Sequence, residues 1–188
     1  GKWNISISIA DKYGSWGINN SNSFLYEDLY SWAMVPNYVN WSNIEKKEVD
    51  KLADNNITIR NLGNVNIINA SINATNLTGQ TFPQFQIPAV NFSFSNSSIN
   101  PCSGSRLKEN QKVSIELFIN YSKSIVSNPA SQNLSFCLKG VPAEIFAQEY
   151  VTEAGKPWDI NAVFGFFISM KYALLAVAVV VKKKRKSK

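Results

Sequence analysis

Apolar and polar residues alternate with a period of two along most of the chain. One such run extends from Trp3 to Ile9, and others cover residues 68–75, 90–95 and 113–121. Alternation of this kind places one face of a strand on a core and the other face in water, as in antiparallel sheets. Turn signals rich in Gly and Pro separate the runs. The pattern predicts an all-β chain built as an antiparallel β-sandwich.

The pattern changes near the C-terminus. Residues 162–181 read AVFGFFISMKYALLAVAVVV, twenty residues with a single charge at Lys171. A helix rises 1.5 Å per residue, so this run would cover roughly 30 Å, the thickness of the hydrocarbon core of a bilayer. We therefore predict a transmembrane helix over 162–181, with the lipid bilayer as a partner.

A basic tail over 182–188 follows this run at once. Because Lys and Arg stay on the cytoplasmic side of a membrane span, the tail orients the predicted helix. The sequence then predicts a single-pass protein of the cell membrane with its N-terminal part outside and its C-terminus in the cytoplasm. The orienting residues are Lys182, Lys183, Lys184, Arg185, Lys186 and Lys188.

Lys171 would lie near the middle of the predicted span, where a charge is costly. Gly165, Ser169 and Ala173 recur every four residues, a stripe of small residues that lets transmembrane helices approach closely. One hypothesis is that Lys171 pairs with an acidic residue of another membrane subunit. The alternative is a tilted helix that tolerates one Lys with help from water or lipid headgroups.

The basic pI of about 9.3 comes from the same region. Seven of the 19 Lys and Arg residues are Lys171 and the six of the tail, which leaves 12 against all 13 Asp and Glu in the rest of the chain. The outer part is therefore almost neutral. This distribution argues against a nucleic-acid partner and for the anionic surface of a membrane.

The two cysteines, Cys102 and Cys137, favour a disulfide, since they are an even number in a domain expected outside the cell. Cys137 lies between Phe136 and Leu138, so it faces away from the apolar set of its strand. Cys102 lies in a predicted turn. We expect a bond at the edge or rim of the sandwich rather than between its two sheets.

Eleven Asn-x-Ser/Thr sequons predict N-glycosylation. The alternative is that the motif has no such function, because a strand that alternates Asn and Ser with apolar residues contains the same spacing. Solvent-facing sequons on strands, such as Asn69, Asn73 and Asn91, are the preferred candidates. The sequons lie at Asn4, Asn19, Asn40, Asn56, Asn69, Asn73, Asn76, Asn91, Asn96, Asn120 and Asn133.

Catalysis receives little support. The chain has no His, which removes the commonest general base and metal ligand. Pairs of carboxylates such as Asp50 with Asp54 are expected to be solvated surface charges. We therefore predict no enzymatic activity, cofactor or metal. Most aromatic residues are expected in the core, with Trp16 exposed in a turn and Trp158 at a membrane interface.

The order of the runs predicts a boundary near residue 27. Residues 1–27, with the alternating strand WNISISIA, the turn DKYG and the strand NSFLY, resemble the closing strands of an upstream immunoglobulin-like or polycystic-kidney-disease-like repeat, truncated at Gly1. Alternatively, they pair into the sheet that follows. Residues 28–161 would form the immunoglobulin-like β-sandwich, ahead of the helix at 162–181 and the tail at 182–188.

Several segments carry a family resemblance. The order VPNYVNWSNI, DNNITIRNLGNVNI, the Cys102 region and LSFCLKGVPAEIFAQEYVTEAGKPWDINAV resembles immunoglobulin-like modules of archaeal S-layer-associated surface proteins. TIRNLGN is similar to the Asn-x-Gly-Asn signature of cell-adhesion-related bacterial and archaeal domains. The resemblance covers residues 35–163 and implies a spacer, adhesin or envelope component.

The sequence therefore predicts a membrane-anchored structural or adhesion module, the C-terminal part of a longer surface protein that contacts other envelope proteins. Two alternatives remain. One is an accessory or receptor subunit of a membrane complex, and the other is a tether for an N-terminal ligand-binding or enzymatic domain.

Overall fold

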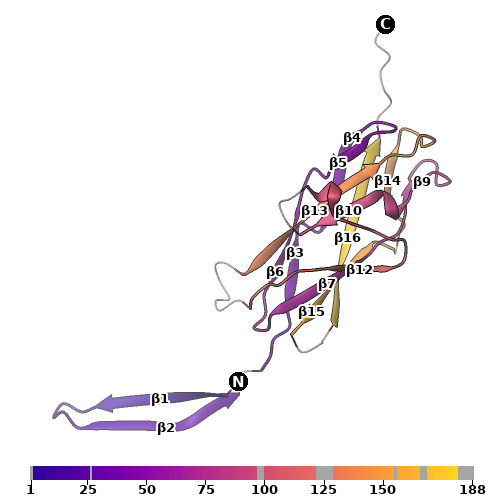
Figure 1. Ribbon diagram of the computed structural model, residues 1–188. Coiled ribbons are helices and arrows are strands. Elements are labelled where there is room, and N and C mark those ends of the chain that lie inside the picture. The colour runs from indigo at the N-terminus through magenta and orange to yellow at the C-terminus, as the bar shows by residue number, and fades with distance from the viewer. Residues whose placement is uncertain are drawn as a thin grey trace.

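The computed structural model describes residues 2–25, 27–96, 100–121, 129–154, 156–165 and 169–181. In these ranges the chain is all-β, with sixteen strands and two short 3₁₀ helices. The prediction of an all-β chain with mainly antiparallel sheets is confirmed. Figure 1 shows a two-stranded hairpin that lies apart from two larger sheets.

The hairpin consists of β1 (Lys2–Ala10) and β2 (Trp16–Leu25), which pair with each other and with no other described strand. Its turn is held by Asp11, whose carboxylate accepts hydrogen bonds from the main-chain N–H of Tyr13 at 2.8 Å and of Ser15 at 2.9 Å. The hydrogen bond from Ser15, followed by that from Tyr13, lowers the pKa of Asp11 below its ordinary value. Trp16 is 72% exposed, as predicted.

The first large sheet has the order β11-β10-β13-β6-β3, and β5 also pairs with β13. Its long strand β13 pairs with β6 through its first half and with β10 and β5 through its second half. The strands are β3 (Trp32–Val35), β5 (Val49–Leu52), β6 (Ile57–Asn61), β10 (Phe92–Ser95), β11 (Ser105–Arg106) and β13 (Ser131–Gly140).

The second large sheet has the order β12-β7-β15-β16-β14-β8-β9, and β4 also pairs with β16. The β4–β16 pair is parallel, whereas the other pairs are antiparallel. The strands are β4 (Tyr38–Ile44), β7 (Ile67–Asn73), β8 (Leu77–Gly79), β9 (Gln86–Ile87), β12 (Lys112–Ile115), β14 (Glu149–Thr152), β15 (Trp158–Phe164) and β16 (Ser169–Val181).

The two sheets share one hydrophobic core. The Trp158 ring of the second sheet lies 5.2 Å from Phe92 and 6.4 Å from Phe136 of the first sheet, measured between ring centroids. Trp41 packs 5.2 Å from Phe92. Trp158 is fully buried, and its indole N–H donates to the main-chain oxygen of Thr75 at 2.7 Å. The prediction that aromatic residues fill the core is thus confirmed for Trp41 and Trp158, and the membrane-interface prediction for Trp158 is wrong.

The helix predicted over 162–181 is also wrong for the residues that the structure describes there. Residues 162–164 end β15, and residues 169–181 form β16. The two strands are antiparallel neighbours, with Trp158 opposite Leu175 and Val163 opposite Ser169. No helix in the described ranges is long and apolar enough to cross a membrane.

The helix prediction failed because a run of apolar residues can form either a helix or a strand. A strand that is covered on both faces reads as a continuous apolar segment, which periodicity alone does not distinguish from a helix. The twenty-residue run here begins with the last three residues of β15 and ends with the thirteen residues of β16, and its total length is that of a membrane span. The end of the run is AVAVVV, and its β-branched valines favour strand over helix.

Candidate functional site

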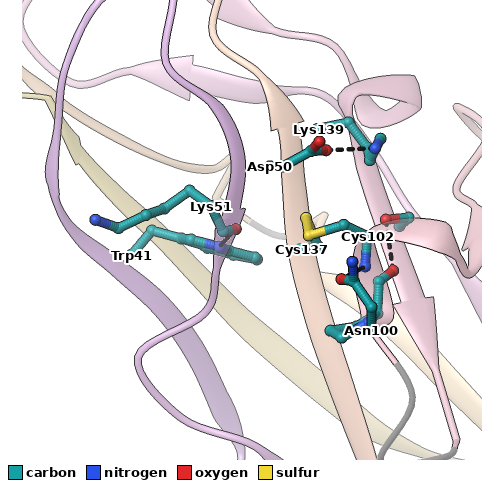
Figure 2. Close-up of a disulfide and its surroundings, with 9 residues drawn as sticks. Trp41, Asp50, Lys51, Asn100, Cys102, Cys137 and Lys139 are labelled. Carbon is teal, nitrogen blue, oxygen red and sulfur yellow. Dashed lines mark hydrogen bonds and ion pairs between the residues drawn. A yellow bond between two sulfur atoms is a disulfide. The ribbon is translucent and has the colours of Figure 1, made fainter.

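A disulfide joins Cys102 to Cys137 on the outer face of the first sheet, as predicted from the parity of Cys137 (Figure 2). Phe136 and Leu138 belong to the core shared by the sheets, whereas Cys137 does not. Cys102 lies in the short 3₁₀ helix η2 (Pro101–Ser103). The bond therefore ties a loop to the sheet from which the loop arises.

The bond is nevertheless buried. Cys137 is inaccessible to solvent and Cys102 is 6% exposed. Figure 2 shows η2 lying over the outer face of β13 at this point, which explains why an outward-facing cysteine is covered. Two polar contacts hold η2 in place: Asn100 Oδ1 accepts from the N–H of Cys102 at 3.0 Å, and Ser93 Oγ donates to the Pro101 oxygen at 2.9 Å.

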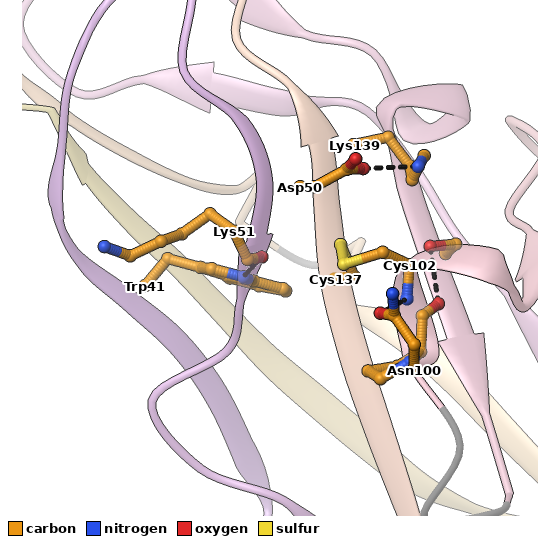
Figure 3. Close-up of polar contacts among 9 residues, drawn as sticks. Trp41, Asp50, Lys51, Asn100, Cys102, Cys137 and Lys139 are labelled. Atoms are coloured by element: carbon orange, nitrogen blue, oxygen red, sulfur yellow. Dashed lines mark hydrogen bonds and ion pairs between the residues drawn. A yellow bond between two sulfur atoms is a disulfide. The ribbon is translucent and has the colours of Figure 1, made fainter.

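Asp50 lies beside the disulfide and forms an ion pair with Lys139 (Figure 3). One oxygen of Asp50 and the two sulfurs lie within 4.8 Å of one another, a spacing that fits a metal centre. The sulfurs are bonded to each other, and metals bind thiolates rather than disulfides. As long as the disulfide is intact, this cluster offers a cation only Asp50, which Lys139 already neutralises.

The carboxylates named as candidate pairs are used separately. Asp50 binds Lys139, whereas Asp54 Oδ2 accepts hydrogen bonds from Asn40 Nδ2 at 2.9 Å and from the Ser42 N–H at 2.7 Å. The geometry therefore does not bring Asp50 and Asp54 together as an acid and a base.

The sequon side chains fall into two groups. The amide nitrogens of four are donors to neighbouring groups, and their side chains are partly buried: Asn40, Asn69, Asn91 and Asn96. Asn73 and Asn76 are also partly buried. The exposed sequons are Asn19, Asn56, Asn120 and Asn133, while the side chain of Asn4 lies outside the described residues.

Asn69, Asn73 and Asn91, the preferred candidates, are partly buried rather than fully exposed, and their glycosylation stays a prediction. Asn69 is covered because its amide lies against Ser114 of the neighbouring strand β12. Asn133 is better placed, since it is exposed on β13 and its oxygen, rather than its nitrogen, is bonded to Thr58 Oγ1 at 2.9 Å. An amide nitrogen in this position is open to modification.

The residues predicted as transmembrane contacts are not arranged on a helix. Lys171 lies opposite Asn161 in the β15–β16 register, and Ser169 lies opposite Val163. Ala173 belongs to the same strand, and Gly165 follows β15, with its N–H bonded to the Asn66 oxygen at 3.0 Å. The stripe required a helical repeat of four residues, which these strands do not provide. The orienting tail from Lys182 to Lys188 lies outside the described residues.

Asn61, Gly63 and Asn64 form a polar network that sequence analysis identified only as a signature. Asn61 is fully buried, and its Nδ2 donates to the main-chain oxygens of Val65, Ile119 and Asn120 while its Oδ1 accepts from Gly63. Asn64 forms hydrogen bonds with the main chain of Glu27 and of Leu29, in the segment that follows the hairpin.

Gly63 completes this network. A Cβ on Gly63 would lie 2.0 Å from the Leu29 oxygen, so only glycine lets the segment after the hairpin pass this close. The Asn-x-Gly-Asn signature thus has a structural role: it ties residues 27–31 to residues 62–64 and, through Asn61, residues 119 and 120 to the same loop.

Sequence analysis also did not identify a second group of residues, which lies in the loops before β9 and before β14 of the second sheet. Phe82, Phe85 and Phe146 form an aromatic cluster, with centroids of Phe85 and Phe146 4.5 Å apart and those of Phe82 and Phe146 5.4 Å apart. Lys46 Nζ lies 5.4 Å from the centroid of Phe146. Phe82 and Phe146 remain 42% and 48% exposed. The three rings come from two loops and Lys46 from a third, so no local pattern in the sequence indicates the cluster.

Comparisons with known proteins give only distant similarity. No known family matches the chain, and no curated protein matches it. Among solved structures, the CooA pilin subunit from enterotoxigenic Escherichia coli is similar at 14% identity with a TM-score of 0.46, over 81% of this chain and 99% of that one. A family 123 glycoside hydrolase from Clostridium perfringens is similar at 12% identity with a TM-score of 0.38, over 78% of this chain and 23% of that one.

Proposed function

We propose that this chain is a structural module of the cell exterior, an envelope or adhesion component that works next to the membrane. The observation that carries the proposal is the buried bond between Cys102 and Cys137. Disulfides persist in oxidising compartments and are rare in the cytosol of most cells. The proposal includes that the protein has no enzymatic activity and that its function depends on the shape and surface of the two sheets.

Within this proposal the two sheets are an immunoglobulin-like sandwich of the archaeal S-layer-associated kind. The proposal is supported by the Asn-x-Gly-Asn signature, because Asn61, Gly63 and Asn64 are all required by the fold. N-glycans at exposed sequons such as Asn133 belong to the same proposal. A glycan there would cover the outer face of β13.

The position of β16 in the second sheet limits how the protein can attach to the membrane. A single pass through a bilayer requires residues 169–181 to leave the second sheet, where they pair with β4, β14 and β15. Crossing the membrane and completing the sheet are mutually exclusive for this segment. Contact with the membrane surface, with other envelope proteins as further partners, does not carry this conflict.

The test is protease treatment of intact native cells followed by peptide mapping without reduction. We expect external protease to cleave the protein, and the peptides that contain Cys102 and Cys137 to be linked. The proposal is wrong if the protein is protected until the cells are lysed and both thiols react with a membrane-permeant alkylating agent. A known cytosolic protein in the same cells, which must stay intact, is the control.

A further inference from the structure

Three groups that can bind a metal ion meet on the outer face of the first sheet: Asp50, Cys102 and Cys137. One carboxylate oxygen of Asp50 and the two sulfurs lie within 4.8 Å of one another. Each group comes from a different element, since Asp50 belongs to β5, Cys137 to β13 and Cys102 to η2. The tertiary structure therefore places a carboxylate beside the cysteine pair.

The pairing of β5 with β13 holds Asp50 in this position. Leu52 lies opposite Cys137, so Asp50, two residues earlier in β5, projects from the same outer face. Its ion pair with Lys139, two residues after Cys137, agrees with this placement (Figure 3). Asp50 has a φ of 54°, in the left-handed region that Asp adopts more readily than most residues. Uncommon main-chain conformations of this kind cluster at binding sites.

The carboxylate gives the cluster its access to solvent. The side chain of Asp50 is 56% exposed, whereas Cys102 is 6% exposed and Cys137 is inaccessible. Figure 2 shows η2 covering the sulfur atoms from the outside. An ion that entered past Asp50 would be enclosed by β13 and η2.

Reduction of the disulfide would turn these groups into a chelate. A dithiol reductant supplies one hydrogen to each cysteine sulfur, and its own two sulfurs become joined. A divalent ion then replaces the two thiol protons, which pass to solvent. Two thiolates on one tetrahedral Zn²⁺ ion lie about 3.8 Å apart, because each Zn–S bond is about 2.3 Å long. The freed sulfurs reach this spacing when they separate to ordinary van der Waals contact.

We propose that the reduced chain binds one Zn²⁺ ion, or a similar divalent ion of intermediate softness, through Cys102, Cys137 and Asp50. Two sulfurs and one oxygen suit such an ion, whereas Mg²⁺ and Ca²⁺ prefer oxygen ligands alone. Water takes the fourth position. The disulfide and the metal ion exclude each other, so the cysteine pair has two alternative states, and the redox conditions select between them. The proposed function concerns the oxidised chain, and the metal site does not rest on it.

The test is titration of the purified full chain with Co²⁺, which replaces Zn²⁺ as a spectroscopic probe. The chain is first reduced with a phosphine, and the excess is removed without air. The reduced parent should bind one ion per chain and show the absorption of a cobalt–thiolate bond, and Zn²⁺ should displace the Co²⁺. The oxidised parent should show no such absorption, because its sulfurs are bonded to each other.

Two variants test the carboxylate. Asp50→Asn should weaken the binding of Co²⁺ and Zn²⁺ by about tenfold or more, since loss of even a supporting group around a metal has an effect of this size. Lys139→Gln is the matched control, because it breaks the same ion pair but keeps the carboxylate, and it should bind both ions nearly as the parent does.

Urea unfolding provides a second measurement. Zn²⁺ should raise the urea midpoint of the reduced parent, because an ion that binds only the folded chain stabilises it. The increase should be smaller for Asp50→Asn than for Lys139→Gln. Fluorescence of the buried Trp158 checks that each reduced chain is folded before metal is added.

Four results would overturn the proposal. The reduced parent might bind no ion, or it might bind one ion between two chains. Asp50→Asn might bind as tightly as the parent or lose no more affinity than Lys139→Gln, so that the carboxylate is not a ligand. Finally, the reduced parent might lose its native fluorescence and not recover it with Zn²⁺, although the site requires folded β5, β13 and η2. None of these results bears on whether external protease reaches the protein, so the proposed function is tested separately.

Discussion

Removing the disulfide should destabilise the protein strongly without changing its fold. The perturbation is the Cys102→Ala/Cys137→Ala variant, compared with the parent chain in its oxidised and reduced forms. Alanine is chosen because both positions are buried, and the hydroxyl of serine would lack a partner there. The outer face of the first sheet would keep its strands but lose the link from β13 to η2.

The magnitude follows from the size of the loop that the bond closes. The sequence separation of 35 residues corresponds to about 4 kcal/mol in the chain-entropy treatment of the unfolded state. Domains are stable by roughly 5–15 kcal/mol, so a loss of this size removes a large part of the free energy of unfolding. For a chain of this length it corresponds to a melting temperature lower by about 8–16 °C.

The assay is urea unfolding followed by tryptophan fluorescence, with and without a reducing agent. The parent should lose about 4 kcal/mol on reduction, and its urea m-value should rise because the unfolded chain becomes less compact. The alanine variant should be at least as unstable as the reduced parent, and the reducing agent should not affect it. If oxidised and reduced parent chains differ by less than about 1 kcal/mol, the entropic reasoning is refuted.

Three further predictions concern other parts of the fold. Asn61→Ala should lower the free energy of unfolding by about 2–4 kcal/mol, because buried main-chain groups lose their partners; a matching loss in the exposed control Asn56→Ala would contradict this. Trp158→Ala should cost about 3–5 kcal/mol in the same measurement, and a cost under 1 kcal/mol would show that the aromatic contact between the sheets is not needed. The pKa of Asp11 is lowered by hydrogen bonds, so its contribution to the hairpin is present above the ordinary value of 3.8 and is lost as the pH falls through the lower folded value. Amide NMR shifts of Tyr13 and Ser15 should follow this titration in the parent and not in Asp11→Asn.

Much of the fold follows from local pattern. Alternation of apolar and polar residues predicted the strands around Ile7, Ile72 and Phe92. In β7 the alternation also gives the burial, since Ala70 and Ile72 are buried while Ser71 and Asn73 are only partly buried. In the hairpin it does not, because Ile7 is 47% exposed. The parity of Cys137 predicted which face the disulfide occupies, since neighbouring strand residues point to opposite sides. These are properties of a few adjacent residues, so the sequence carries them directly.

The candidate sites were harder to predict because they combine distant segments. Burial of Asn69 depends on Ser114 in another strand, and coverage of Cys137 depends on a 3₁₀ helix formed by residues 101–103. The aromatic cluster brings Phe82 against Phe146 of another loop, and Gln148 holds the main chain of Phe82 there. Spacing along the chain holds no information on such contacts.

The sequence by itself determined the all-β class, the cysteine pair and the position of the basic tail, because composition and short-range periodicity are enough for each. Only the tertiary structure decided that residues 162–181 contribute to two strands. The same apolar residues can form a sheet strand or a membrane helix, and the two differ in where the main-chain hydrogen bonds go. Those bonds run from β16 to β4, β14 and β15, partners that lie at very different distances along the chain.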